Sequence, residues 1–483
     1  MKTKTLYLLT IIFIGAFPFG NTFYKVFRGL SVSFFHTFTK TAPFAVHLPP
    51  LFEKYIHFYL TDFWIVALLT FAFALKEVRA KELFLNRHSQ FLTFYSLVAT
   101  FSIAFSLFAS YPYQYVTLIN LTLSFAAFHL IYHLMSKKTE WISKALWLFA
   151  IIAFLECLIG TGQFLFQQCL GLSFLSEPQI TPLMDNIATY PLNEKSRLFF
   201  ALLPWAPLKG SKILRAYGTF DHPNIFGGYL AIALFVTYYL ILTAKAKAQK
   251  AFLYLLLPFL ILTLFLTFSR GPLFAWILGT IFFFSVGIFK KMEGFAKLGA
   301  IIGSAFLIAF ALLFQQLAAR GGVVNYNGIS QASDAGRMLF YKLGLAMFFH
   351  HPFLGIGYNG FSLFPYEVLD PSFLGANPAG ALSHSIYLQV ASETGLIGLA
   401  LMGCFMISIF MKSFKVKTTP LSLTFSAILL SFLLIGVVDH FLWAYNSGRL
   451  MLFIFAGLFA AYTKAKERPS FSHEKYGVKL SSV

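Results

Sequence analysis

The chain has 483 residues, of which 58% are hydrophobic, 19% aromatic and only 11% charged, and its formal net charge is +19. Soluble globular proteins carry about 25% charged residues, so this composition excludes a water-facing surface over most of the chain. Because the apolar residues occur in runs long enough to cross a bilayer as helices, the sequence predicts an all-α, polytopic integral membrane protein.

Twelve apolar segments predict the membrane-spanning helices of one domain, residues 1–463. They lie near residues 4–20, 57–75, 90–109, 112–135, 145–165, 225–243, 251–268, 272–289, 298–316, 386–411, 421–438 and 450–463. The first has the basic start and apolar core of a signal peptide. It lacks a small-x-small cleavage site, so we expect it to remain as a span.

The basic residues predict the orientation of these helices. Lys and Arg cluster at the N-terminus, in short loops and in the tail at residues 464–483, as expected for segments on the cytoplasmic side. This distribution explains the positive charge without a nucleic-acid partner. Two longer segments, residues 166–224 and 317–385, then emerge on the outer face. Long structured loops are where functional sites are often built.

Three arginines are predicted at this outer face: Arg215 in RAYGTFDHPN, Arg270 in FSRGP and Arg337 in DAGRMLF. A guanidinium group meets phosphate oxygens through two parallel hydrogen bonds and keeps its charge at all physiological pH values. A single arginine at this depth can equally anchor a helix to the lipid headgroups, and that alternative stays open. Three on one face favour a site for a phosphate-bearing lipid.

His384 opens the tenth predicted helix and allows two interpretations. Imidazole titrates near neutral pH, so it can act as a general base, or it can simply bond to water or a carbonyl at a helix end. Glu393 falls on a different face of that helix, so we expect it to make a buried polar contact rather than to orient His384. Asn224 and Asp439, at the outer ends of two other helices, are possible supporting residues.

Several motifs are missing from the sequence. It contains no P-loop and no D-x-D pair, which disfavours a P-loop nucleotide-binding protein and a nucleotide-sugar transferase. Its three cysteines are too scattered for a disulfide framework or a zinc site. We therefore expect neither a metal ion nor a cofactor.

Four stretches together resemble the O-antigen ligase and polymerase superfamily of bacterial membrane glycosyltransferases. They are RAYGTFDHPNIFGGYLAI, LTFSRGP, GRMLFYKLGLAMFFHHPFLGIGYNGF and HSIYLQVASETGLIGL, within about residues 215–400. The chain departs from the pattern at Ser385, where many relatives have Asn.

The resemblance implies that a glycan moves from an undecaprenyl-pyrophosphate donor to an acceptor hydroxyl at the periplasmic face of the bacterial inner membrane. The reaction would invert the anomeric carbon without a metal. Arg215, Arg270 and Arg337 would bind the pyrophosphate, and His384 would be the catalytic base. A ligase would use lipid A–core as acceptor, and a polymerase with the same donor is the alternative. A flippase or transporter, a third possibility, predicts polar residues at the bilayer midplane and internal repeats.

Overall fold

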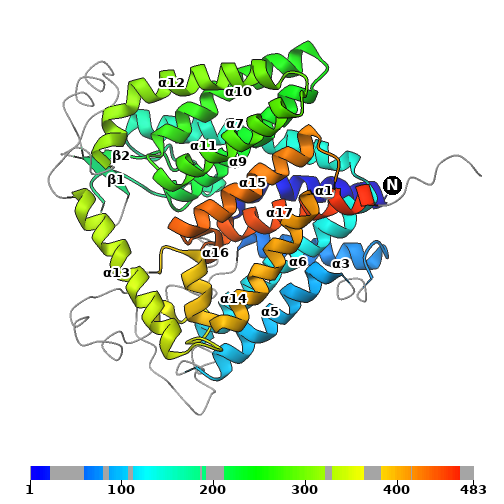
Figure 1. Ribbon diagram of the computed structural model, residues 1–483, viewed down its shortest axis with the longest axis vertical. Helices are drawn as coiled ribbons and strands as arrows, with labels where there is room; N and C mark the ends of the chain where they lie inside the picture. Colours follow the sequence, from blue (N-terminus) through cyan, green and yellow to red (C-terminus); the bar gives the residue numbers. More distant parts are fainter. Residues whose placement is uncertain are drawn as a thin grey trace, which may run out of the picture.

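The computed structural model shows a bundle of long helices (Figure 1). It describes residues 2–21, 59–79, 86–106, 112–184, 188–191, 212–320, 329–363, 382–414 and 416–467. Both long outer segments are therefore described in part. Residues 468–483 of the predicted basic tail lie outside the described residues.

Twelve helices overlap the twelve predicted spans. They are α1 (Lys2–Ala16), α3 (Leu60–Ala74), α5 (Arg87–Ala104), α6 (Pro112–Lys137), α7 (Glu140–Phe166), α9 (Pro223–Thr243), α10 (Lys247–Leu266), α11 (Arg270–Phe289), α12 (Phe295–Arg320), α14 (Ile386–Ser413), α15 (Pro420–Val438) and α17 (Asn446–Glu467). Within the described residues, nine segments are long and apolar enough to cross a membrane, and two shorter apolar helices accompany them. The predicted class, a polytopic helical membrane protein, is confirmed.

Several helices extend past their predicted polar ends. α7 begins at Glu140 rather than near residue 145, and α17 begins at Asn446 rather than near residue 450. The prediction followed the apolar residues alone. A helix remains the most economical way to satisfy backbone hydrogen bonds at the edge of the bilayer, so it continues through polar residues there.

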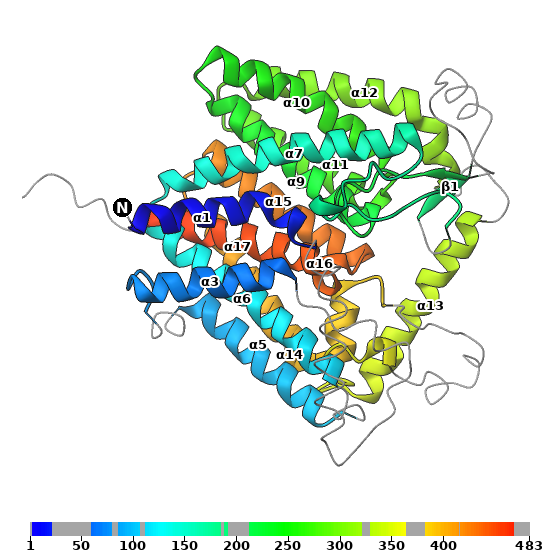
Figure 2. The same ribbon diagram turned by 180° about the vertical axis from the view of Figure 1, so that it is seen from behind.

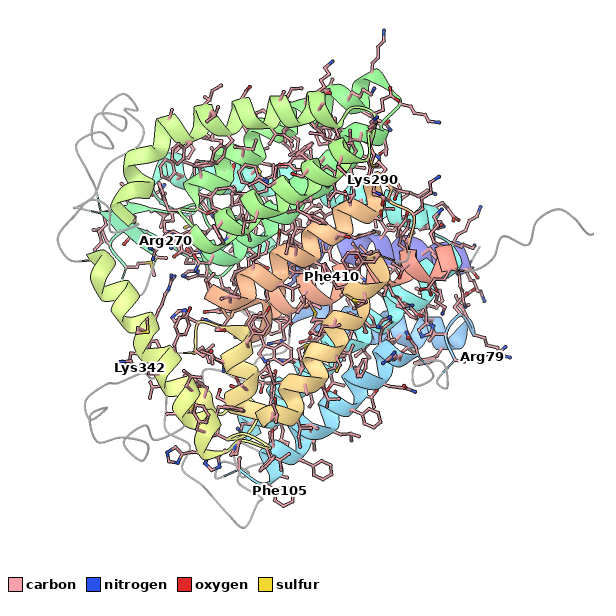
Figure 3. The ribbon with its side chains drawn as sticks, in the orientation of Figure 1. Arg79, Phe105, Arg270, Lys290, Lys342 and Phe410 are labelled. Atoms are coloured by element: carbon pink, nitrogen blue, oxygen red, sulfur yellow. The ribbon has the colours of Figure 1, made fainter. Side chains whose placement is uncertain are left out.

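The bundle has two chemically different ends. The N-terminus, Arg79 and Lys290 lie at one, which we call the basic end (Figures 1 and 3). At the other, the α13 end, lie Arg270 and helix α13 (Ile329–His350) (Figures 1 and 3). A short antiparallel ribbon of β1 (Thr189–Pro191) and β2 (Lys212–Leu214) also lies there (Figure 2). The described parts of both long segments therefore share one end.

Helix α13 was expected to be part of a loop. Its apolar residues Leu339, Leu343 and Met347 recur every four positions and so form one stripe. Leu343 and Met347 are fully buried against Ile356 and Phe361, which belong to the loop that follows. The four-residue spacing of these apolar side chains is present in the sequence, but polar residues separate them, so the segment does not stand out as an apolar run.

Helix α9 lies at the centre and is buried along almost its whole length. Two glycines at its start let other elements approach closely. A Cβ atom at Gly227 would lie 3.0 Å from the side chain of Ser269, and one at Gly228 would lie 2.6 Å from the ring of Phe441. These glycines bring the turn between α10 and α11, and the short helix α16 (Phe441–Ala444), against the start of α9.

Candidate functional site

The segment before α9 is fixed by polar side chains of α7. Gln163 donates to the carbonyl of Gly218 (2.8 Å) and accepts from the amide of Tyr217 (3.1 Å). The carboxyl group of Glu156 accepts from the amide (3.0 Å) and the hydroxyl (2.5 Å) of Thr219. These buried bonds give RAYGTFDHPN one defined path, although it is not a regular helix or strand.

Arg215 connects this segment to the turn between α10 and α11. It is only 2% exposed. Its Nε donates to the carbonyl of Thr267 (2.6 Å), and its Nη2 donates to Asn224 Oδ1 (2.8 Å) and Ser269 Oγ (3.0 Å). The guanidinium group of Arg215 therefore joins the motif RAYGTFDHPN to the motif LTFSRGP. Its Nε and Nη2 atoms both donate hydrogen bonds to protein groups.

Asn224 links Arg215 to Asp439 through hydrogen bonds of its side-chain amide. Its Nδ2 donates to Asp439 Oδ2 (2.7 Å), and the backbone amides of His440 and Phe441 donate to Asp439 Oδ1 (2.8 and 3.3 Å). Burial on its own raises the pKa of the Asp439 carboxyl group. The imidazoles of His440 and His222 and the amide of Asn224 outweigh burial, so the pKa falls below its usual value. Asp439 is therefore ionised at neutral pH.

Two histidines lie beside Asp439. The ring centroids of His384 and His440 are 4.9 Å apart, with their planes at 70°. In the described part of the chain, neither buried Nδ1 atom has a hydrogen-bond partner. Burial, followed by repulsion from His440 in its protonated form, lowers the pKa of His384 to about 4, and burial also lowers that of His440. Both imidazoles are therefore neutral at pH 7 and able to accept a proton.

The backbone at His384 is unusual. The residue lies two positions before α14 rather than inside it, and its φ of 53° is in the left-handed region. A non-glycine residue there costs about 1–3 kcal/mol, which persists only where surrounding contacts hold it. Here the hydroxyl of Ser383 donates to the carbonyl of Ser385 (2.7 Å), across the strained residue.

Helix α13 supplies the next part of the site. The ring of Phe340 is 5.9 Å from that of His384, and the hydroxyl of Tyr341 donates to the His384 carbonyl (3.5 Å). The charge of half-buried Arg337 is among the causes that lower the pKa of both His384 and His440. A cationic group from α13 therefore lies close to two neutral imidazoles.

Arg270 is the first residue of α11 and is partly exposed at the α13 end (Figure 3). The predicted spans 251–268 and 272–289 place Arg270 in the short turn between them. The turn is instead made by the preceding residues, where Phe268 has a φ of 47°, and both Gly271 and Pro272 belong to the helix. Arg270 directly follows Ser269, the partner of Arg215, so the two arginines flank one short turn.

Helix α14 is interrupted at Gly395, whose φ of 66° and ψ of −166° are not helical. The loop after α13 fills the interruption. The amide of Ile356 donates to the carbonyl of Ser392 (2.9 Å), and the amide of Leu396 donates to the carbonyl of Pro352 (2.7 Å). Buried Glu393 bonds to Gln389 (2.5 Å), which agrees with a packing role for this residue. The motif GIGYNG thereby supports the helix that follows His384.

A metal ion would have three side chains within reach here. One donor atom from each of His384, Asp439 and His440 lies within 4.8 Å of the other two. The chemistry fits a cation poorly, because both oxygens of Asp439 already accept hydrogen bonds and Arg337 adds positive charge. With Arg270 nearby, the electrostatics favour an anionic ligand.

The fold and this polar centre define a multi-pass membrane protein with a site at one end of its bundle. Residues 253–403 match the model of the O-antigen ligase family. The match confirms the predicted resemblance to the O-antigen ligase and polymerase superfamily, and it indicates a membrane enzyme of the glycosyltransferase type. Its partners are then a lipid-linked glycan and an acceptor. No curated protein matches the chain.

The matched segment contains Arg270, Arg337 and His384, but not Arg215 or Asp439. The structure brings Asp439 against His384 and links it to Arg215 through Asn224. Sequence reasoning did not include Ser269, and it considered His440 only together with Asp439, as a pair that either positions a polar substrate or marks the water interface. The signals were the pair Asp439-His440 after the eleventh span and the serine inside FSRGP.

Proposed function

We propose that the protein is an O-antigen ligase. It moves a glycan from undecaprenyl pyrophosphate to a hydroxyl of lipid A–core at the periplasmic face of the inner membrane. The observation that carries this proposal is the neutral imidazole of His384 beside the cationic side chain of Arg337, at the same end of the bundle as Arg270. This transfer needs a general base for the acceptor hydroxyl and a cationic binding site for the pyrophosphate.

The arginines bind the leaving group in this proposal. Pyrophosphate is a good leaving group whose developing charge needs neutralisation more than protonation, and arginines do this well in a site of low dielectric. Arg270 and Arg337, which are partly exposed, contact the phosphate oxygens. Arg215 adds its charge from behind and holds Asn224 and Ser269 in place.

The reaction is a direct displacement in this scheme. The acceptor oxygen forms a bond to the anomeric carbon as the bond from that carbon to the pyrophosphate oxygen breaks, which inverts the configuration. The hydroxyl proton passes to a ring nitrogen of His384, and the lipid pyrophosphate leaves as an anion. Ionised Asp439 stabilises the imidazolium that results. No step requires a metal ion, because the arginines supply the positive charge.

The proposal is tested by the glycan profile of cells that lack this protein. Lipid A–core without O-antigen, together with accumulated lipid-linked polymer, is the expected result, and the wild-type gene should reverse it. Core that carries a single repeat unit would identify a polymerase instead. An unchanged profile would contradict both transfer functions.

A further inference from the structure

A groove runs along the outside of the bundle between α11 and α12. Helix α12 lies at the edge of the bundle (Figures 1 and 2). The groove has a volume of about 850 Å³, and most of its lining side chains are apolar. Because α11 is a candidate membrane span and the part of α12 beside it is an apolar helix, a hydrocarbon chain is the natural occupant.

Small residues give the groove its depth. Gly299, Ala300 and Gly303 line it on α12. A Cβ atom at Gly303 would meet no other atom within 4 Å, whereas one at Gly299 would touch the ring of Phe284 at 3.3 Å. The space above Gly303 is therefore open rather than filled by a neighbouring side chain.

Two aromatic rings lie at the end of the groove that is nearer the α13 end. The rings of Trp276 and Phe306 meet across it, with their centroids 5.9 Å apart. Trp276 lies six residues after Arg270, about 9 Å along the helix. Within the described lining, this aromatic pair therefore lies on the side of the groove that faces Arg270.

The opposite end of the groove is strongly basic. Lys290, Lys291 and Lys297 are exposed around the turn that joins α11 to α12, and Glu293 is the acidic residue among them. Among the described residues, no carboxylate pairs with these lysines, and Lys290 lies over the ring of exposed Phe289, 6.0 Å from its centroid. Exposed positive charge thus lies beside the end of the groove that Ile288 and Phe289 line.

We propose that this groove binds an anionic phospholipid from the leaflet at the basic end. One acyl chain lies along Gly299 and Gly303, and the phosphate-bearing headgroup lies among Lys290, Lys291 and Lys297. The spacing Gly299-x-x-x-Gly303 is also known from helix dimers. A second copy in the groove would bring two sets of lysines together, so charge favours the lipid.

The test is native mass spectrometry of the full-length protein, purified in an equal mixture of palmitoyl-oleoyl phosphatidylglycerol and phosphatidylcholine. One lysine near a membrane surface favours anionic lipid by about fivefold. The two net charges at the turn therefore predict one retained phosphatidylglycerol, preferred by roughly 25-fold over phosphatidylcholine. Equal retention of the two lipids would overturn the proposal.

Two variants test the contact with the acyl chain and the contact with the headgroup separately. Gly303→Leu fills the groove and should lower lipid retention at least about fivefold, whereas Gly403→Leu is its control, because a Cβ atom there also meets open space. The triple change K290Q/K291Q/K297Q leaves the packing intact and should remove the headgroup preference. The matched triple change K245Q/K247Q/K250Q, in the neighbouring basic turn, should not.

Unchanged retention in Gly303→Leu, or an unchanged preference in K290Q/K291Q/K297Q, would contradict the proposal. A wild-type dimer that Gly303→Leu dissociates would assign the groove to a second copy and so also overturn it. None of these variants touches the candidate site, so glycan transfer should persist. The result is therefore independent of the proposed function.

Discussion

The two ends of the bundle both carry positive charge, but the charged groups differ in burial and in hydrogen bonding. At the α13 end, Arg215 is 2% exposed and bonds to three neighbours, which fixes the position of its charge. At the basic end, Lys290 and Lys291 are exposed on a turn. A fixed guanidinium group can recognise the shape of a ligand, whereas a mobile ammonium group provides mainly long-range attraction. The buried, fixed charge is suited to binding a ligand in one geometry, and the exposed charges are suited to orienting the protein in a membrane.

The largest expected effect is that of His384→Ala. Removing a general base typically costs about 10²–10⁴-fold in rate, so we expect transfer to fall by that factor while the protein stays folded. Transfer by purified protein from a lipid-linked donor would be measured beside the thermal unfolding midpoint. His350→Ala, which removes an exposed histidine from α13, is the control and should keep full activity. Near-normal transfer by His384→Ala would remove this residue from the mechanism.

A charge-conserving exchange at each end sharpens the comparison. Arg270→Lys keeps the charge but cannot present two parallel donors to phosphate oxygens, so we expect transfer to fall by roughly tenfold. Lys290→Arg at the basic end should leave the rate unchanged. The measurement is the rate of transfer as a function of donor concentration. Full activity of Arg270→Lys would favour a simple anchor at the lipid headgroups.

The smallest expected effect is that of pH. Because burial lowers the pKa of His384 to about 4, its base form predominates above about pH 5. The transfer rate should change by less than about twofold between pH 6 and 8 and fall as pH drops toward 4. Protein returned to pH 7 after each incubation distinguishes titration from unfolding. A midpoint near the ordinary value of 6.5 would contradict a neutral, buried imidazole.

Much of the fold follows from the sequence because a bilayer leaves few alternatives. An apolar run of sufficient length becomes a helix, and the basic loops lie at one end. Helix α13 was missed because it is not among the described helices that are apolar enough for a membrane span, and its apolar residues form only a narrow stripe. Its two fully buried residues, Leu343 and Met347, are too few to stand out by hydropathy.

The candidate site was predictable in its parts but not in its connections. The residue types pointed to phosphate binding and base catalysis, since few side chains can perform either task. Nothing in the sequence indicated that Arg215 is buried, or that Asn224 bonds to a carboxylate 215 positions away. Contacts over such distances depend on how the helices pack. Close approaches such as that of Gly228 to Phe441 determine that packing.

The interruption of α14 at Gly395 has a consequence for how the protein is made. A membrane insertion machinery delivers helices in chain order, and an intact helix satisfies its own backbone. The carbonyl of Ser392 and the amide of Leu396 obtain partners only when the loop after α13 docks beside them. We therefore expect the segment that presents His384 to mature last, after the spans have assembled.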